Sequence, residues 1–480
     1  MKIVESYGII LLNTLRLPFN TRLKMFNFDS NVKNKYYNLY LSLRDEILRG
    51  KLKAGEKLPS KRALAADAGV SVVTVQLAYE QLLIEGYIRS VERSGYFVEE
   101  LNGAAFNRGR GSAKKSYAEA VKPVPKFKVD LVNGATPAAL FPFSTWAKLI
   151  RNVLSDCGEH LLERVPADGD AALKDEIAAY LYRARGIDVN SKNIVVGAGA
   201  EHLYGVIVNL LGRDKLFAVE NPGYGKISYT YLRNGACVLP VRVTGSGISV
   251  DEIKLSCADV AHVSPSHQFP TGAVMPASAR SELIGWAADG DKYIIEDDYD
   301  SEFRLTGKPL QSAFSMCPER VIYLNTFSKS LAPSMRMGYM ILPEPLYEKY
   351  LRMFSDSANL VSLFEQKALA AFLKGGYFER HIARLRNHCR GIREEISEIF
   401  SSFGERCEVT DNGSGLHITV KFYNAGSDGE IKSRAAEKGV NIKCLSDYLT
   451  EPLDGFGKCA VINYSGLTRA DTDYLKNLEF

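Results

Sequence analysis

From Asp130 onward, short runs of β-branched residues alternate with stretches whose apolar residues recur at helical spacing. Strands that alternate with helices are typical of an α/β domain with a mostly parallel sheet. The expected strands of this sheet are residues 194–196, 216–219, 260–263, 293–296, 321–324 and 339–342. Two later runs, 417–421 and 461–464, predict a smaller α+β subdomain that begins at about residue 375.

A different pattern precedes this domain. Apolar residues recur at helical spacing from Tyr37, and Gly50 marks the expected end of that helix. Ser60 and Ser71 are expected to cap two further helices, the first running through Ala66. Two short alternating runs with a tight turn at 92–95 then predict a β-hairpin, formed by residues 87–89 and 96–98. Three helices followed by a hairpin are typical of a winged helix-turn-helix.

The segment 101–128 separates the two patterns. It is rich in Gly, Ser, Ala, Lys and Arg, holds Glu119 as its one acidic residue, and ends in two prolines. Such a composition is typical of a flexible basic linker. We therefore expect a multidomain chain made of an N-terminal extension (1–30), a winged helix-turn-helix (31–100), the linker (101–128) and the α/β domain (129–480). Met25 is a second candidate start of translation.

Composition excludes several classes of protein. The chain is 46% hydrophobic and 24% charged, as in globular proteins, and its net charge of +4 is too small to indicate nucleic-acid binding by itself. The eight cysteines form no C-x-x-C pair and no short His/Cys cluster, which favours reduced thiols and argues against a metal site. No run approaches the ~18–20 apolar residues that span a bilayer, so we expect a cytoplasmic protein that does not contact a membrane.

The expected winged helix offers contacts to DNA. A recognition helix presents its N-terminal turn to the base edges and packs its other face on a supporting helix. Ser71, Thr74 and Gln76 are expected to point outward from that helix. Four basic residues are expected to neutralise phosphates, namely Lys61, Arg62, Arg89 and Arg93.

Residues 36–98 resemble the GntR-type winged helix. The resemblance rests on Gly50, Gly55, Leu58-Pro59-Ser60, Arg62, Leu64-Ala65, Val70-Ser71, Thr74-Val75, Ala78-Tyr79, Leu82, Gly86-Tyr87 and Ser94-Gly95-Tyr96-Phe97-Val98. The alternative is a purely structural helical domain with incidental basic residues, which would not require so many matched positions. One departure is Val72, because the family usually has arginine directly after the capping serine. The operator is therefore expected to differ, or to depend on Lys61, Arg62 and Gln76.

The α/β half carries candidates for the groups that pyridoxal phosphate needs from a protein. These are a lysine for a Schiff base, a carboxylate for the pyridinium nitrogen, donors to the phosphate and an aromatic cover for the ring. Lys329 follows one expected strand, with Arg336 seven residues further on. Asp297 and Tyr299 follow another, and open α/β sheets place ligand contacts at the carboxyl ends of their strands.

The remaining candidates concern the phosphate and the ring face. Gly199, Ala200 and Glu201 follow the 194–196 strand and open a helix, whose N–H groups attract anions. Thr326 and Ser328 add hydroxyl groups, and the turn at Tyr224 supplies an aromatic for stacking. Each feature alone is more often a surface lysine, a charged loop or a packing turn. Their order and spacing together favour a cofactor site.

Residues from about 130 to 480 resemble fold type I aminotransferases, and nearly the whole chain resembles the MocR/GabR-type regulators. The resemblance rests on Glu220-Asn221-Pro222-Gly223-Tyr224, Ser264-Pro265-Ser266-His267-Gln268-Phe269-Pro270-Thr271-Gly272, the segment 296–304, the segment 326–331 and Arg336-Met337-Gly338-Tyr339. It implies the Schiff-base role for Lys329, the pyridinium contact for Asp297, the ring hydroxyl for Tyr299, ring stacking for Tyr224 and the phosphate for Arg336. It also implies a head-to-tail homodimer in which each DNA-binding domain reaches over the partner's aminotransferase-like body.

Two departures bear on activity. Active aminotransferases of this fold hold the substrate α-carboxylate with an arginine near the C-terminus, where this chain has Val461-Ile462-Asn463-Tyr464-Ser465. Without that bidentate clamp, ordinary transamination is expected to be weak. Glu201 stands where the family often has glutamine, and its carboxylate repels a phosphate unless it faces away. Lys226 is a candidate for binding an anionic effector, although a solvated lysine is the more common reading.

We therefore expect a pyridoxal-phosphate-dependent transcriptional regulator. An amine, an amino acid or pyridoxal phosphate itself would be the signal that alters operator binding near the chain's own or neighbouring genes. The first alternative is a working aminotransferase that acts on an amino acid and a 2-oxo acid. The second is a GntR-like repressor whose body merely dimerises and binds no cofactor.

Overall fold

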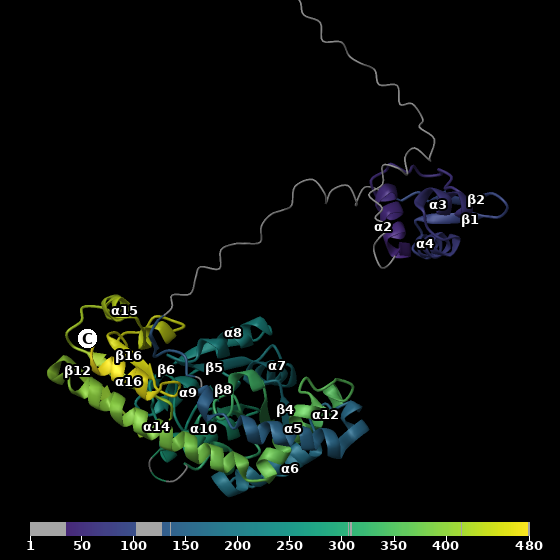
Figure 1. Ribbon diagram of the computed structural model, residues 1–480. Helices are drawn as coiled ribbons and strands as arrows, with labels where there is room; N and C mark the ends of the chain where they lie inside the picture. Colours follow the sequence, from purple (N-terminus) through teal and green to yellow (C-terminus); the bar gives the residue numbers. More distant parts are fainter. Residues whose placement is uncertain are drawn as a thin grey trace, which may run out of the picture. The chain divides into compact units, whose positions relative to one another are not determined.

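The computed structural model describes residues 35–101, 127–134, 136–305, 307, 310–413 and 415–478. The chain divides into two compact units, residues 1–124 and 125–480, and each is described by itself (Figure 1). The expected N-terminal extension and residues 102–126 of the expected linker lie outside the described residues. Within the described ranges, no helix is long and apolar enough to cross a membrane.

The first unit is a winged helix-turn-helix. Its helices are α2 (Lys35–Leu48), α3 (Lys61–Ala68) and α4 (Val72–Ile84). Ser60 caps α3 and Ser71 caps α4, as the sequence predicts, since each side chain accepts a hydrogen bond from the backbone three residues on. Helix α3 runs two residues further than expected, because Gly69 takes a left-handed conformation that ends it (φ 65°).

The wing is an antiparallel hairpin of β1 (Ile88–Val91) and β2 (Gly95–Val98). Val91 pairs with Gly95, so the turn is shorter than the expected 92–95 segment. A single core joins the wing to the helices, because Ile88 and Val98 are buried in the same cluster as residues of α2, α3 and α4. This core fixes the wing and the recognition helix as one body.

The second unit contains an eight-stranded sheet in the order β4-β11-β10-β9-β8-β5-β6-β7. Its strands are β4 (Ile194–Gly197), β5 (Leu216–Asn221), β6 (Cys237–Thr244), β7 (Gly247–Ile248), β8 (Val260–Val263), β9 (Tyr293–Asp297), β10 (Val321–Thr326) and β11 (Gly338–Ile341). All pairings are parallel except those of β11 with its two neighbours and of β6 with β7. The expected mostly parallel α/β sheet is confirmed.

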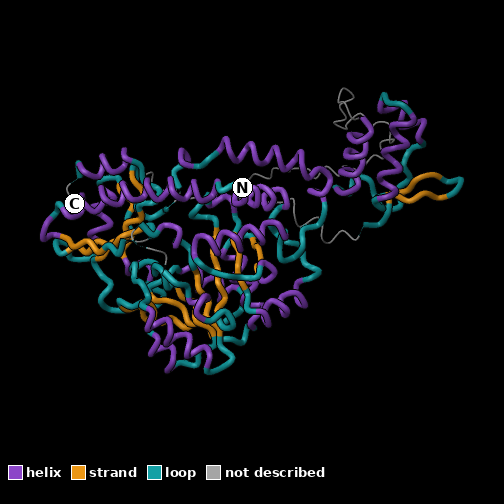
Figure 2. Tube along the Cα trace, turned by 90° about the horizontal axis from the view of Figure 1, so that it is seen from below, coloured by secondary structure: helices purple, strands orange, loops and turns teal. Residues whose placement is uncertain are grey.

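Helices cover both faces of this sheet (Figure 2). Successive strand residues alternate between two apolar cores, as Ile294 and Ile295 do in β9. One core contains side chains of α7 (Ala200–Leu211), α8 (Gly225–Arg233) and α12 (Glu344–Phe354). The other contains side chains of α5 (Phe143–Cys157), α6 (Ala171–Arg185), α9 (Val250–Leu255), α10 (Ala277–Ala288), α11 (Ala313–Met316), α13 (Leu363–Lys374) and α14 (Tyr377–Ser401).

A smaller α+β subdomain follows, as expected. Its four-stranded sheet has the order β12-β13-β16-β15, formed by β12 (Cys407–Thr410), β13 (His417–Phe422), β16 (Cys459–Asn463) and β15 (Lys443–Cys444). Helices α14, α15 (Asp428–Glu437) and α16 (Arg469–Lys476) pack against it, and α14 continues into the large core. The first strand of the second unit also belongs to this subdomain, because β3 (Val129–Asp130) pairs with β14 (Val440–Asn441).

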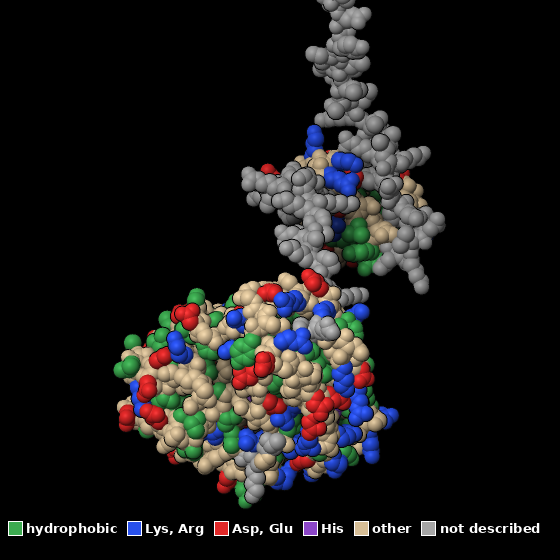
Figure 3. All heavy atoms as spheres, turned by 90° about the vertical axis from the view of Figure 1, so that its left-hand side faces the viewer, with side chains coloured by type: hydrophobic (Ala, Val, Ile, Leu, Met, Phe, Trp, Pro, Cys, Tyr) green, Lys and Arg blue, Asp and Glu red, His purple; other side chains and the backbone are tan. Residues whose placement is uncertain are grey.

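Six strands among the described residues were not predicted, namely the eight-residue β6 and the two- to four-residue strands β3, β7, β12, β14 and β15. β6 holds Pro240 and Arg242 and lies near an edge of the sheet, so its sequence does not read as a buried apolar run. On the face of the second unit in Figure 3, Lys and Arg side chains are interspersed with Asp and Glu. On this face neither sign of charge predominates.

Candidate functional site

The expected cofactor residues come together at one edge of the large sheet. Asp297 ends β9, Thr326 ends β10 and Gly197 ends β4, and the strand register places these ends along the same edge. The segments that leave these strands carry the other predicted residues, Gly199, Ala200, Glu201, Tyr299, Ser328, Lys329 and Arg336. All of these residues lie at or just after the ends of strands, as the sequence predicted.

Lys329 is partly buried at this edge. Its Nζ donates a hydrogen bond to the Gly134 carbonyl oxygen at 2.9 Å, and its own carbonyl accepts from Thr136 Oγ1 at 3.1 Å. Burial lowers the pKa of Lys329, and the nearby Asp300 carboxylate raises it in part. A lowered pKa increases the share of neutral amine, which is the form that attacks a carbonyl carbon.

Asp297 lies in a network of buried polar groups. The Tyr204 hydroxyl donates to its carboxylate, and His262 Nε2 lies 3.4 Å from the same oxygen. On the other side of the ring, Nδ1 of His262 is hydrogen-bonded to the Tyr231 hydroxyl. Sequence reasoning missed Tyr204 and His262, although a histidine inside the apolar run 260–263 was a usable signal.

Arg336 and the N-terminus of α7 face the same space. A Cβ on Gly199 would lie 3.5 Å from the Arg336 guanidinium carbon, an ordinary contact distance, so the guanidinium lies beside the start of α7. Gly199 has φ of 84° and precedes α7, whose first turn holds Ala200 and Glu201. Free N–H groups at a helix start and a guanidinium are the groups that bind a phosphate.

Glu201 and Lys226 form an ion pair, with 3.4 Å between Oε1 and Nζ. The pairing answers the concern that an unpaired carboxylate would repel a phosphate here. It also means that Lys226, a predicted effector contact, already has a partner.

Tyr224, next to α8, is 46% exposed and meets the edge of Phe269, with 6.1 Å between ring centroids.

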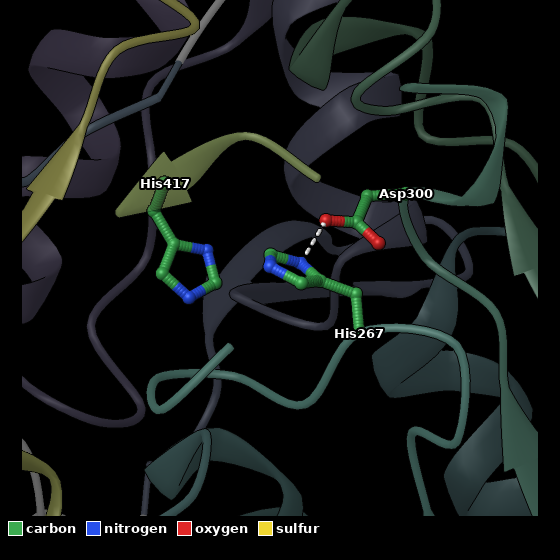
Figure 4. A group of neighbouring side chains, drawn as sticks. All are labelled: His267, Asp300 and His417. Carbon is green, nitrogen blue, oxygen red and sulfur yellow. Dashed lines mark hydrogen bonds and ion pairs between the residues drawn. The ribbon is translucent and has the colours of Figure 1, made fainter. Parts of the chain in front are cut away.

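Figure 4 shows a group of three buried side chains, His267, Asp300 and His417, and the Tyr299 hydroxyl contacts this group. His267 Nδ1 lies 2.8 Å from an Asp300 carboxylate oxygen and 3.2 Å from the Tyr299 hydroxyl. The His417 ring lies beside that of His267 at a tilt of 45°, and its Nε2 donates to the Pro270 carbonyl. Burial, more than the neighbouring His267, holds the pKa of His417 well below the ordinary value. Among the described residues, this is the one group with metal-ligand spacing, and its members already bond to one another or to the backbone.

The acidic run around Asp297 is buried rather than a solvated loop. Glu296 accepts hydrogen bonds from two backbone N–H groups at the start of α11. Asp298 binds Arg185, with 2.9 Å between the nearest atoms, and Glu302 accepts from Asn325. Burial raises the pKa of Glu296 and of Glu302 to about 7. These three carboxylates therefore serve the fold. Asp297, which also has partners, ends β9 at the edge where the other predicted cofactor residues lie.

The stretch that lacks the expected arginine lies beside Lys329. Gly134, which accepts from Lys329 Nζ, packs so closely on Asn463 and Ser465 that a Cβ there would clash with both side chains. Ser465 donates to Asn463 Oδ1 from its N–H and from its hydroxyl. Val461 is 2% exposed in the middle of β16. A buried valine thus stands where the arginine was expected, and the polar groups nearest to Gly134 are the amide of Asn463 and the hydroxyl of Ser465.

The predicted DNA contacts all lie in the winged helix. Lys61 and Arg62 begin α3, and Lys61 lies over the Tyr96 ring of the wing at 5.6 Å. Ser71 and Thr74 are hydrogen-bonded to each other through their hydroxyls, so part of their capacity serves the helix cap. Gln76 is exposed and donates to Glu80.

Two predicted contacts lie in the hairpin. Arg89 Nε lies 3.1 Å from a carboxylate oxygen of Glu99, and this carboxylate competes with a phosphate for the Arg89 guanidinium. Arg93 occupies the wing turn with φ of 57°. No partner is recorded for Arg62 or Arg93 among the described residues, so both remain available to an anion.

Two family models match the chain. Residues 35–98 match the model described as bacterial regulatory proteins of the gntR family. Residues 135–475 match the model of class I and II aminotransferases. The first match covers the winged helix and the second covers the large sheet and the smaller subdomain.

Individual proteins give the same picture. The chain is 34% identical to an uncharacterized HTH-type transcriptional regulator, YdeL of Bacillus subtilis, over 91% of this chain and 94% of the relative. It is 32% identical to the probable rhizopine catabolism regulatory protein MocR of Rhizobium meliloti, over 89% and 90%. Among solved structures, a kynurenine aminotransferase of Pyrococcus horikoshii matches with a TM-score of 0.65 and 22% identity, over 76% of this chain and 93% of that one. At that identity the likeness shows the fold alone.

Proposed function

The chain belongs to the MocR-type transcriptional regulators, in which a GntR-family winged helix-turn-helix is joined to a class I and II aminotransferase domain, and from this we propose that occupancy of the Lys329 site controls DNA binding. The proposal has two parts. Pyridoxal phosphate binds at the edge of the large sheet, and its reaction with an amine, or its own arrival, is the signal. DNA occupancy by the winged helix is the response.

One observation carries the first part. A lysine with a lowered pKa, a carboxylate with two polar supports and an arginine beside a helix N-terminus meet at one edge of the sheet. These groups fit the aldehyde, the pyridine nitrogen and the phosphate of pyridoxal phosphate in turn. When bound, the cofactor would supply an aldehyde that condenses with primary amines.

Each residue would then have one task. Lys329 would hold the cofactor covalently and release it to an incoming amine. Asp297, supported by Tyr204 and His262, would keep a proton on the ring nitrogen. Arg336, the first turn of α7, Thr326 and Ser328 would bind the phosphate. Tyr224 would cover the ring and Tyr299 would meet its hydroxyl group.

The neighbourhood of Lys329 favours a sensor over an enzyme. Asn463 and Ser465 are neutral, and Val461 has no charge with which to hold a carboxylate. A bidentate arginine–carboxylate pair is among the strongest contacts a site can offer, so its absence weakens the binding of α-amino acids. We therefore propose slow or absent turnover. The rival function, a working aminotransferase, shares the fold and the Lys329 site.

We also propose a head-to-tail homodimer. The described part of the second unit exposes large apolar side chains, among them Phe143, Leu162, Tyr229 and Leu232 at 58–81%. Exposed apolar groups of this size are typical of interaction surfaces. Sedimentation of the full chain would give the mass of a dimer if the proposal holds, and that of a monomer if it does not.

Trapping experiments test the cofactor site directly. The full chain is mixed with pyridoxal phosphate, reduced with borohydride and digested, and the modified peptide is identified by mass. The proposal expects the label on Lys329 and none in Lys329→Ala, and a label spread over surface lysines contradicts it. The matched control is Lys367→Ala, which removes a lysine whose amine pairs with Asp170 outside the proposed site.

A panel of amino acids with a 2-oxo acid then separates sensor from enzyme. Trapped cofactor without sustained production of new keto acid supports the regulator. Sustained production that stops in Lys329→Ala supports the aminotransferase.

A further inference from the structure

The recognition helix α4 exposes apolar side chains on its outer face. Val72, Val73 and Leu77 are 43%, 65% and 44% exposed. The opposite face of the helix, which includes Val75 and Ala78, is fully buried in the core of the first unit. The exposed residues therefore play no part in that core.

The polar groups of α4 do not compensate for this apolar face. The helix from Val72 to Ile84 contains no lysine, arginine or histidine. Ser71 and Thr74 bond to each other at the cap, and the amide of Gln76 donates to Glu80. The groups at the first turn that remain free for contact are largely the methyl groups of the two valines.

Basic residues flank this face instead of lying on it. Lys61 and Arg62 begin α3, which packs on α4, and the Tyr79 hydroxyl of α4 donates to the Pro59 carbonyl just before them. Lys61 also lies over Tyr96 of the wing, which ties α3 to the hairpin that carries Arg93. Cations on α3 and on the wing suit contacts to DNA phosphates, while the apolar first turn of α4 enters the groove.

In the major groove, the one apolar feature of a base edge is the 5-methyl group of thymine. We propose that Val72 and Val73 recognise thymine methyl groups, so that operator specificity here comes from apolar contacts at the first turn of α4. The proposal rests on the proposed function, since it assumes that the winged helix binds DNA. The cationic flanks favour DNA over a second copy of this chain as the occupant of this face.

Uracil substitution isolates the methyl group, because uracil pairs as thymine does and differs by that group alone. Duplexes that the full chain selects from a randomised pool are compared with copies in which single thymines are replaced by uracil. We expect affinity to fall about fourfold for each contacted methyl, the value of one buried CH₂ group. The proposal is overturned if every uracil duplex binds with the same affinity as the thymine duplex from which it was made.

Variants identify the residues. Val73→Ala removes methyl groups at an exposed position where alanine favours the helix, so the fold is kept. It should lose the thymine preference at the positions that Val73 contacts, while the preference that depends on Val72 remains. The matched control is Ile84→Ala, at the far end of the same helix and 79% exposed, which should keep the full thymine preference. The proposal is contradicted if Val73→Ala keeps the thymine preference of the wild type at every position. It is also contradicted if Val73→Ala changes the oligomeric state instead.

The converse variant sharpens the test. Val72→Arg places a guanidinium at the first turn, and arginine binds the O6 and N7 atoms of guanine. Selection with this variant should shift the preferred base from thymine to guanine. If the wild-type chain selects no sequence at all, the proposed DNA-binding function fails. If it selects a sequence but ignores thymine methyls, only this inference fails.

Discussion

The two candidate sites of this chain are built in opposite ways. At the edge of the large sheet, Lys329 is partly buried and donates to the Gly134 carbonyl, and Asp297 lies against the buried Tyr204 and His262. On α4, the residues that would face DNA are exposed and apolar, with few partners to fix them. The first site is a rigid constellation, whereas the second is a surface whose chemistry is set by single side chains.

This difference predicts how each site responds to change. A buried network fixes distances, so removing one charge should affect binding strongly and should disturb its neighbours. An exposed helix face tolerates substitution, so a change there should alter which DNA is chosen and leave the fold intact.

The largest effect is expected at Asp297. Asp297→Asn removes the charge that holds a proton on the ring nitrogen, and a hydrogen bond to a charged group is worth about 1.5–3 kcal/mol, or roughly 10–100-fold in affinity. Fluorescence titration with pyridoxal phosphate measures the loss. Tyr204→Phe is the matched control, because it keeps the carboxylate and removes one supporting donor. It should cost about fivefold. Unchanged affinity in Asp297→Asn would contradict the assignment.

A pH effect is expected at Glu302, within the same buried run. Burial, more than the nearby Asp298, raises the pKa of Glu302 from 4.5 to about 7. The carboxyl group of Glu302 therefore binds its proton more tightly in the folded chain than in the unfolded chain. This proton stabilises the folded chain fully below about pH 4.5, and the stabilisation is lost as the pH rises through about 7. Glu302→Gln resembles the protonated acid and cannot lose the proton. Its melting temperature should fall less than that of the wild type between pH 5 and 8, and parallel curves would refute the idea.

A smaller effect is expected at the exposed site. Ser71→Ala removes the N-cap of α4, and such caps are worth about 1 kcal/mol. Hydrogen exchange of the α4 amides in the full chain measures the change in local opening. Ser42→Ala in α2 serves as the control, because Ser42 only bonds back to a carbonyl one turn earlier. Equal protection in wild type and Ser71→Ala would show that the cap does not hold the recognition helix.

The same contrast explains what the sequence could predict. Asp297, Lys329 and Arg336 each follow or precede a short apolar strand, and a parallel sheet brings such ends together, so their meeting was predictable from order and spacing. The caps at Ser60 and Ser71 were equally readable, because they depend on local chemistry alone.

What the sequence could not supply depends on contacts distant along the chain. Tyr204 reaches Asp297 across 93 residues, and Lys329 reaches Gly134 across 195. The burial of Glu296 and Glu302 likewise arises from packing that no local pattern records. The pairing of Lys226 with Glu201 spans 25 residues and joins two helices that the sequence treats separately.

The central claim is that the Lys329 site and the winged helix are coupled, and one measurement tests it most directly. The affinity of the full chain for its selected DNA is measured by anisotropy, with and without pyridoxal phosphate and a panel of primary amines, in wild type and in Lys329→Ala. The account predicts a change of about 5–150-fold in the wild type, the usual range of coupling between sites, and no change in the variant. A wild type whose DNA affinity ignores every ligand, or a variant that responds as the wild type does, would contradict it.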